Sequence, residues 1–195
     1  CRSGKRTGLA AIRIALDMLE EGLIDEKTAI TRVDASQVTT LMRPVFNIDA
    51  VAKAREEGAV LAKGLPAGPG AASGSVCFYS DEVEAARQNW GRVILVRVET
   101  SPEDIKGMEA AEGILTARGG MTSHAALVAR QRGKACVSGC GALEINYRLR
   151  SMKIGDTVIS EGDPISIDGT TGEVFVGKLE YSPSEVNAVL IEKTL

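Results

Sequence analysis

The chain has 195 residues, 44% of them hydrophobic and 25% charged, which is typical of a folded globular protein and not of a disordered one. Its net charge of −3 argues against a nucleic-acid partner, because binding a phosphate backbone requires a basic excess. No apolar run has the length of a membrane span, so we expect no membrane partner. The single histidine, His124, excludes any chemistry that needs two histidines in this chain.

The cysteines and the first residue bear on the cellular context. The chain has four cysteines, and its one close pair, Cys136 and Cys140, has no second pair to complete a zinc site. We therefore expect no metal in this chain, and free thiols in a reducing compartment. The chain begins with Cys1 and carries no secretory signal. We expect a piece of a longer intracellular polypeptide.

Composition changes near residue 64. Residues 1–63 contain four of the 21 glycines and one of the six prolines, and residues 64–195 contain the rest. Helices are predicted over residues 7–21, 26–33 and 36–42, from helical spacing of apolar residues, from Asp25 as an N-cap and from a stop before Pro44. Residues 1–63 are therefore predicted to form a helical linker subdomain.

Residues 64–180 are predicted to form an α/β domain. The glycines and prolines of residues 64–74 predict a tight surface loop, with no Gly-Lys-Ser/Thr to make it a Walker loop. Hydrophobic patterning and end signals then predict strands and helices in alternation. The predicted strands are 75–79, 92–98, 113–117, 135–138, 157–160, 164–168 and 173–176, and the predicted helices are 81–89, 101–111 and 123–132. A last helix is predicted to begin at Ser182, within a helical linker over residues 181–195.

One stretch, residues 115–130, carries recognisable chemistry. A strand ends, Gly119 and Gly120 make a turn, Thr122 or Ser123 caps a helix, and His124 lies in the first helical turn. Glycines allow close approach of a phosphate to the backbone, and free N–H groups at a helix start favour an anion. The helix dipole favours the neutral imidazole, which is the nucleophilic form.

These features would assemble a phosphorylatable histidine. Thr122, Ser123 and the two glycines would position the phosphoryl group, and Arg118 could pair with its oxygens. Each residue also has a structural interpretation. His124 could be a surface or capping residue, Thr122 a plain N-cap and Arg118 a solvated charge.

The segment Gly-Gly-Met-Thr-Ser-His-Ala-Ala at residues 119–126, followed by Val-Ala-Arg at 128–130, resembles the phosphohistidine signature of the phosphoenolpyruvate-utilising enzymes. Residues 63–74, 99–105 and 136–140 also match, so the resemblance covers essentially the whole chain. Within the family the pattern is most similar to the pyruvate, phosphate dikinases. The synthases and enzyme I have arginine where Met121 stands.

The resemblance implies a β/β/α swivelling domain over residues 64–180. His124 would carry a phosphoryl group, on the ring nitrogen remote from the backbone, between an ATP-grasp domain and a phosphoenolpyruvate/pyruvate barrel domain. The parent reaction would convert ATP, phosphate and pyruvate to AMP, pyrophosphate and phosphoenolpyruvate. By itself the chain would be inactive, because both partner domains lie outside it.

The resemblance also implies features of a parent enzyme. Magnesium would be bound by the domains outside this chain, the parent would be a homodimer, and Thr122 would be a candidate for regulatory phosphorylation. The resemblance leaves the cytoplasm, a chloroplast and a glycosome all open as the compartment. A phosphate on Thr122 would place negative charge beside the ring and repel an incoming phosphoryl group. Two alternatives stay open: the carrier domain of a phosphoenolpyruvate synthase or related enzyme, and a hinge module in which His124 is only structural.

Overall fold

The computed structural model describes residues 8–182, and these divide into two compact units, residues 8–43 and residues 44–182. Cys1 and the helix predicted beyond Ser182 lie outside the described residues.

The first unit consists of three short helices. They are α1 (Gly8–Glu20), α2 (Glu26–Thr31) and α3 (Ala35–Leu41), so all three predicted helices are confirmed. Gly22 follows α1 with a φ of 70°, a conformation that glycine adopts without strain. The Asp25 carboxylate accepts a hydrogen bond of 2.8 Å from the Thr28 backbone N–H and so caps α2, as its sequence position predicts.

The second unit combines β-sheet with helices. Its strands are β1 (Val45–Phe46), β2 (Val60–Lys63), β3 (Leu65–Gly68), β4 (Ala71–Cys77), β5 (Val93–Arg97), β6 (Gly113–Thr116), β7 (Ala135–Ser138), β8 (Glu144–Asn146), β9 (Ser151–Ile154), β10 (Thr157–Ser160), β11 (Pro164–Asp168), β12 (Glu173–Val176) and β13 (Tyr181–Ser182). Its helices are α4 (Ile48–Glu56), α5 (Val83–Trp90), the 3-10 turn Pro102–Asp104, α6 (Ile105–Ala110) and α7 (His124–Arg132).

Eight strands form one mixed sheet in the order β2-β12-β11-β4-β5-β6-β7-β3. The strands from β4 to β7 run parallel, and the other pairs are antiparallel. The two edge strands, β2 and β3, are separated in sequence only by Gly64, so the sheet curls back on itself. A backbone hydrogen bond of 2.8 Å from Gly64 N–H to the Gly172 carbonyl supports this closure.

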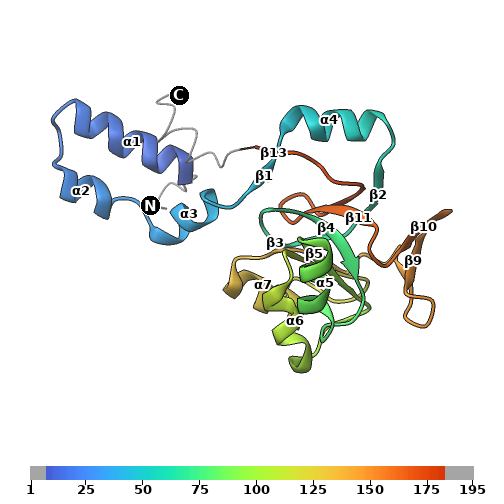
Figure 1. The fold of residues 1–195 in the computed structure, drawn as a ribbon. Coiled ribbons are helices and arrows are strands. Elements are labelled where there is room, and N and C mark those ends of the chain that lie inside the picture. Colours follow the sequence, from blue (N-terminus) through green and yellow to red (C-terminus); the bar gives the residue numbers. More distant parts are fainter. Residues whose placement is uncertain (1–7, 183–195) are drawn as a thin grey trace. The chain divides into compact units, whose positions relative to one another are not determined.

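The second unit is built in three layers. Helices α5, α6 and α7 lie side by side on one face of the large sheet (Figure 1), and their buried residues form one apolar cluster with β4, β5, β6 and β7. The small antiparallel sheet β10-β9-β8 packs on the other cluster, where Met152, Ile154 and Ile159 meet Ile94 and Leu115. This β/β/α layering confirms the predicted α/β class.

The structure corrects the prediction of a surface loop over residues 64–74. This segment contains all of β3 and half of β4, and β4 is buried throughout. Two of its glycines, Gly68 and Gly74, serve close packing and not turning. A Cβ atom on Gly68 would lie 2.7 Å from the Lys134 carbonyl oxygen, and one on Gly74 would lie 2.6 Å from that of Arg92. Glycine is used where another backbone approaches a strand this closely.

Residues 44–63 also contain structure that the sequence analysis did not predict. They supply β1, α4 and β2, and β2 pairs with β12 in the large sheet. Phe46 is buried and packs edge-to-face on Phe175, with ring centroids 6.5 Å apart. The domain boundaries at residues 63/64 and 180/181 stay predictions. The compact unit itself begins at Pro44 and ends at Ser182.

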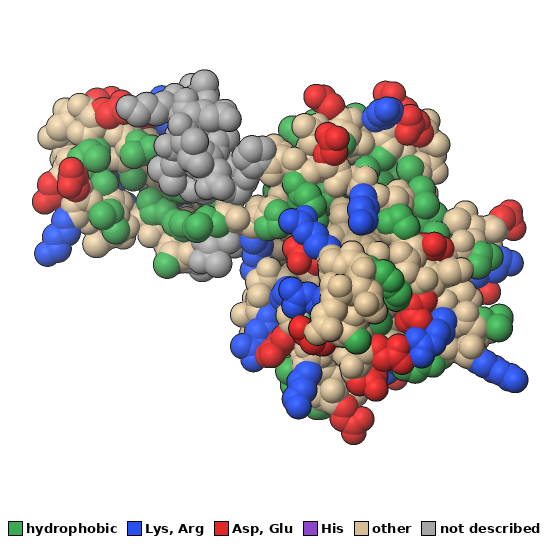
Figure 2. Space-filling model, viewed as in Figure 1, with side chains coloured by type: hydrophobic (Ala, Val, Ile, Leu, Met, Phe, Trp, Pro, Cys, Tyr) green, Lys and Arg blue, Asp and Glu red, His purple; other side chains and the backbone are tan. Residues whose placement is uncertain are grey.

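On the face drawn in Figure 2, acidic and basic side chains of residues 44–182 are intermixed. Cys77, Cys136 and Cys140 are free and buried, as predicted, and burial raises the pKa of each thiol to about 11. Among residues 8–182, no helix has the length and apolar character needed to cross a bilayer.

Candidate functional site

His124 is the first residue of α7 and lies beyond the carboxyl end of β6. Two backbone hydrogen bonds continue the pairing of β5 and β6 into the loop that leads to it. Ala117 N–H donates to the Arg97 carbonyl at 3.0 Å, and Arg118 N–H donates to the Val98 carbonyl at 2.8 Å. The histidine therefore lies at the edge of the sheet where parallel strands end, which is where α/β folds commonly place their sites.

The loop before the helix depends on glycine at residue 119. Gly119 has a φ of 109°, and a Cβ atom there would lie 3.0 Å from Cβ of Ser123. Both the backbone conformation and the lack of space require a residue without a side chain. A backbone hydrogen bond of 3.0 Å from Ser123 N–H to the Gly120 carbonyl closes the turn.

Ser123 is the N-cap of α7. Its backbone is extended, with φ −64° and ψ 162°, and its Oγ accepts a hydrogen bond of 3.3 Å from Ala126 N–H. Thr122 is exposed and does not cap the helix. The structure thus decides between the two caps that the sequence left open, and it leaves the Thr122 hydroxyl at the surface.

Several backbone N–H groups around the histidine are unpaired. Among the described residues, no hydrogen bond is formed by the N–H groups of Gly119, Gly120, Met121, Thr122, His124 and Ala125. Free N–H groups at a helix start, together with the helix dipole, attract an anion. The loop and the first turn of α7 thus offer donors to an anion.

The imidazole of His124 is half-buried, and its Nε2 atom is fully buried. Within the described part of the chain, Nε2 has no hydrogen-bond partner. Leaving a buried polar atom unpaired costs about 1–3 kcal/mol. In this ring orientation Nε2 has no access to an external phosphoryl donor, so phosphorylation at that nitrogen requires the ring to turn.

The predicted site residues occupy one loop and one helix end. Arg118, Gly119 and Thr122 are exposed, and Gly120 and Ser123 are half-buried. The Arg118 guanidinium forms no ion pair or hydrogen bond with any residue between 8 and 182, so its charge is free to meet a ligand. All six predicted residues, His124 included, lie within residues 118–124, which are adjacent in sequence.

Two further side chains contact this loop. The buried Thr116 hydroxyl donates a hydrogen bond of 2.8 Å to the Arg118 carbonyl. The Arg130 guanidinium donates through Nε to the Ala126 carbonyl at 3.1 Å and through Nη2 to the Met121 carbonyl. Arg130 is part of the sequence resemblance, but no pattern in the sequence assigns it or Thr116 a role.

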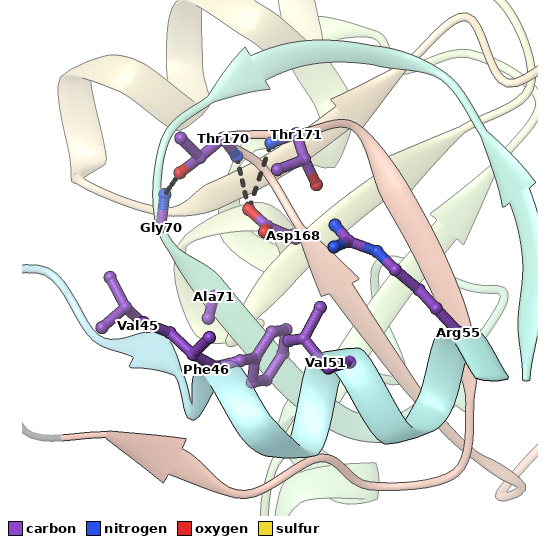
Figure 3. A pocket seen from close by; sticks show the side chains of 11 residues that line it. Val45, Phe46, Val51, Arg55, Gly70, Ala71, Asp168, Thr170 and Thr171 are labelled. Atoms are coloured by element: carbon purple, nitrogen blue, oxygen red, sulfur yellow. Dashed lines mark hydrogen bonds between the residues drawn. The ribbon is translucent and has the colours of Figure 1, made fainter. Parts of the chain in front are cut away.

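The unit also has a pocket elsewhere. It encloses about 300 Å³, and its lining residues come from β1, α4 and the turns that follow β3 and β11. Figure 3 shows Arg55 extending from α4 toward Asp168, with Phe46 and Val51 forming the apolar wall. Arg55 is paired with Glu173 at 2.6 Å. None of the predicted site residues lines this pocket. Among residues 8–182, no three His, Cys, Asp or Glu side chains are grouped to hold a metal.

Residues 91–172, which include His124, match the family model described as the PEP-utilising enzyme, mobile domain. This part of the chain is therefore similar to the mobile domain of that family. More specifically, the chain is homologous to pyruvate, phosphate dikinases along almost its whole length. It is 54% identical to the chloroplastic enzyme of Flaveria trinervia over 94% of this chain, and 52% identical to the Clostridium symbiosum enzyme over 95%.

The chain spans about a fifth of these curated relatives, 19% of the Flaveria trinervia protein and 21% of the Clostridium symbiosum protein. A solved NMR structure of an Enzyme I protein is also similar, with 25% sequence identity and a TM-score of 0.33. The match covers 52% of this chain and 35% of the Enzyme I chain.

Proposed function

We propose that this chain is a phosphohistidine carrier domain of the pyruvate, phosphate dikinase type, with His124 as the carrier. The observation that carries the proposal concerns the surroundings of His124. The chain's single histidine begins a helix beside a glycine loop whose N–H groups lack partners, at the sheet edge where parallel strands end. Homology to the mobile domain and to the dikinases supports it.

Phosphorylation of His124 is an in-line displacement. The neutral ring first turns to expose Nε2, which is buried in the structure. The lone pair of Nε2 then attacks the phosphorus of phosphoenolpyruvate while the bond from phosphorus to the enol oxygen breaks. Pyruvate leaves as its enolate and takes up a proton. The dipole of α7 and the N–H groups around the ring stabilise the negative oxygens of the transferred group. Arg118, in the exposed part of the loop before α7, would supply a positive charge to these oxygens.

The partners of His124 in this proposal lie on the same polypeptide. A nucleotide-binding ATP-grasp domain would exchange phosphoryl groups with ATP and phosphate, and a barrel domain would exchange them with pyruvate and phosphoenolpyruvate. Magnesium held by those domains would neutralise charge on the phosphoryl oxygens. The parent would be a homodimer, and the compact unit of residues 44–182 would move as the swivelling domain.

Thr122 is proposed as the regulatory position. Its hydroxyl is exposed, so a kinase can reach it, and it is two residues from His124. A phosphate there would add about −1.5 to −2 charge and occupy the same N–H groups that the carried phosphoryl group needs. Phosphorylation of Thr122 would therefore block the carrier without changing the fold.

The proposal is tested by phosphorylating the chain in trans. The chain is mixed with phosphoenolpyruvate, magnesium and the barrel domain of the Clostridium symbiosum relative, and its intact mass is measured under alkaline conditions that preserve phosphohistidine. We expect one added phosphoryl group, absent in His124→Asn. A phosphoryl group that persists in His124→Asn would contradict the carrier role, and so would its complete absence from the wild-type chain.

A further inference from the structure

Two side chains bind carbonyl groups of the loop that precedes His124, and each carbonyl shares a peptide unit with an unpaired N–H. The Thr116 hydroxyl binds the carbonyl of Arg118, which belongs to the same peptide unit as the N–H of Gly119. The Arg130 guanidinium binds the carbonyl of Met121, which belongs to the same peptide unit as the N–H of Thr122.

In a trans peptide unit the C=O and N–H bonds lie in one plane and point in opposite directions. Every described peptide bond in this loop is trans. Fixing the carbonyl oxygen on one side of the unit therefore fixes the N–H on the other side. Neither the Gly119 N–H nor the Thr122 N–H forms a hydrogen bond with a described residue.

We propose that Thr116 and Arg130 are positioning residues for the carrier: they orient the N–H groups of Gly119 and Thr122 toward the phosphoryl group on His124. This inference rests on the proposed function. Orientation matters here because Gly119 and Gly120 allow the loop many backbone conformations. Donors that are already oriented lose no reorganisation energy when the charge arrives.

The positions of the two side chains separate this role from a general effect on folding. Arg130 is exposed, and it bridges from the body of α7 to the loop, so its removal exposes no core. Thr116 is fully buried, but valine has nearly its shape and lacks only the hydroxyl. Each contact can thus be removed with little change in packing.

The chain supplies matched controls for both positions. Arg132 lies on the same helix, carries the same charge and pairs with Glu109 at 2.5 Å, away from the loop. Arg132→Met therefore controls for the charge lost in Arg130→Met. Thr116→Ser keeps the donor that Thr116→Val removes, so it should restore the wild-type behaviour.

The test uses the 195-residue chain and phosphoramidate as a small phosphoryl donor. The imidazole nitrogen of His124 attacks phosphorus, the phosphorus–nitrogen bond of phosphoramidate breaks, and ammonia leaves after taking up a proton. The rate is measured against phosphoramidate concentration, and amide resonances of residues 119 and 122 are followed by ¹H–¹⁵N NMR. His124→Asn identifies the phosphorylated residue.

We expect Arg130→Met and Thr116→Val each to slow phosphorylation of His124 by about tenfold, the scale of one hydrogen bond to a charged group. The shift of the residue 119 amide on phosphorylation should be lost in Thr116→Val, and that of the residue 122 amide in Arg130→Met. Arg132→Met and Thr116→Ser should match the wild-type chain. Wild-type rates and wild-type amide shifts in both Arg130→Met and Thr116→Val would overturn the positioning role, and would leave the proposed function intact. Phosphorylation of the wild-type chain at a residue other than His124 would overturn the proposed function as well.

Discussion

The backbone of Gly139 packs against the carbonyl oxygen of Gly119, and a Cβ atom added at Gly139 would lie 2.5 Å from that oxygen. Gly139 follows β7 and has a φ of 62°. The segment after β7 thus supports the loop that carries the unpaired N–H groups, across the ends of the parallel strands β6 and β7. Glycine is required at residue 139 both for its conformation and for this approach.

Gly139→Ala should therefore displace the peptide unit that joins Gly119 to Gly120, which carries the unpaired Gly120 N–H, and slow phosphorylation of His124. We also expect the free energy of unfolding to fall by about 1–3 kcal/mol, the range for a side chain in a strained conformation. The matched control is Gly141→Ala, because a Cβ atom there would meet nothing within 4 Å. Equal phosphorylation rates in the two variants would show that the contact with Gly119 does not matter.

The N-cap of α7 gives a second prediction. Ser123→Ala removes the oxygen that accepts from Ala126 N–H, and it should lower the free energy of unfolding by about 1 kcal/mol. Thr122→Ala removes an exposed hydroxyl that does not cap the helix and should be neutral for stability. Urea denaturation of both variants measures this difference. The assignment of the cap would be wrong if Thr122→Ala were the more destabilising change.

Asp104 predicts a pH dependence of stability. It is 3% exposed. Burial alone raises the pKa of its carboxyl, but the hydrogen bonds from Ser80 and Ser101 and the charge of Arg97 together lower it below its usual value. A carboxyl with a lowered pKa in the folded state stabilises that state above its usual pKa, near 4, and loses this effect as the pH falls through the lowered value.

Asp104→Asn should consequently destabilise the chain at pH 7 by about 1–3 kcal/mol, since it removes a charged acceptor of several hydrogen bonds. The difference in the free energy of unfolding between wild type and Asp104→Asn should narrow as the pH falls below about 4. Urea denaturation across this range measures it. A gap that stayed constant with pH would contradict a stabilising charge at Asp104.

The extent of the sheet domain is tested by two shortened chains. A chain of residues 44–182 keeps β1, α4 and β2, whereas one of residues 64–182 loses β2 and the buried Phe46. We expect cooperative thermal unfolding from the first chain and a much lower melting temperature in the second. Equal melting temperatures would favour a domain boundary at residue 64.

The sequence predicts the alternating core of the fold because its signals there are local. Ser101 and Pro102 begin a helix, and Gly133 ends one in the left-handed conformation. The prediction fails at residues 64–74, where glycine and proline usually indicate a turn. Glycine is needed at residues 68 and 74 because backbone segments from elsewhere in the chain pack against them. This is a requirement of the tertiary structure. No local pattern reveals such a neighbour.

In the candidate site, too, some residues are predictable from the sequence and others only from the tertiary structure. His124, its glycines and its cap are adjacent in sequence, so the motif identifies them. Gly139, by contrast, reaches the site only through the pairing of β6 with β7. Thr116 and Arg130 are near in sequence, but their roles depend on which carbonyl each one meets. The burial of the His124 Nε2 atom also depends on how the ring packs in the folded chain, so no sequence pattern predicts it.

The central claim is that His124 carries the phosphoryl group, and a ³¹P NMR spectrum of the chain tests it most directly. The chain is phosphorylated from phosphoenolpyruvate with the barrel domain that we propose as its partner, and its spectrum is recorded at alkaline pH. Because the chain has a single histidine, any phosphohistidine signal belongs to His124. We predict one phosphorus resonance, coupled to the ring protons beside Nε2. A resonance from a hydroxyl or carboxyl phosphate, with none coupled to the imidazole, would contradict the account.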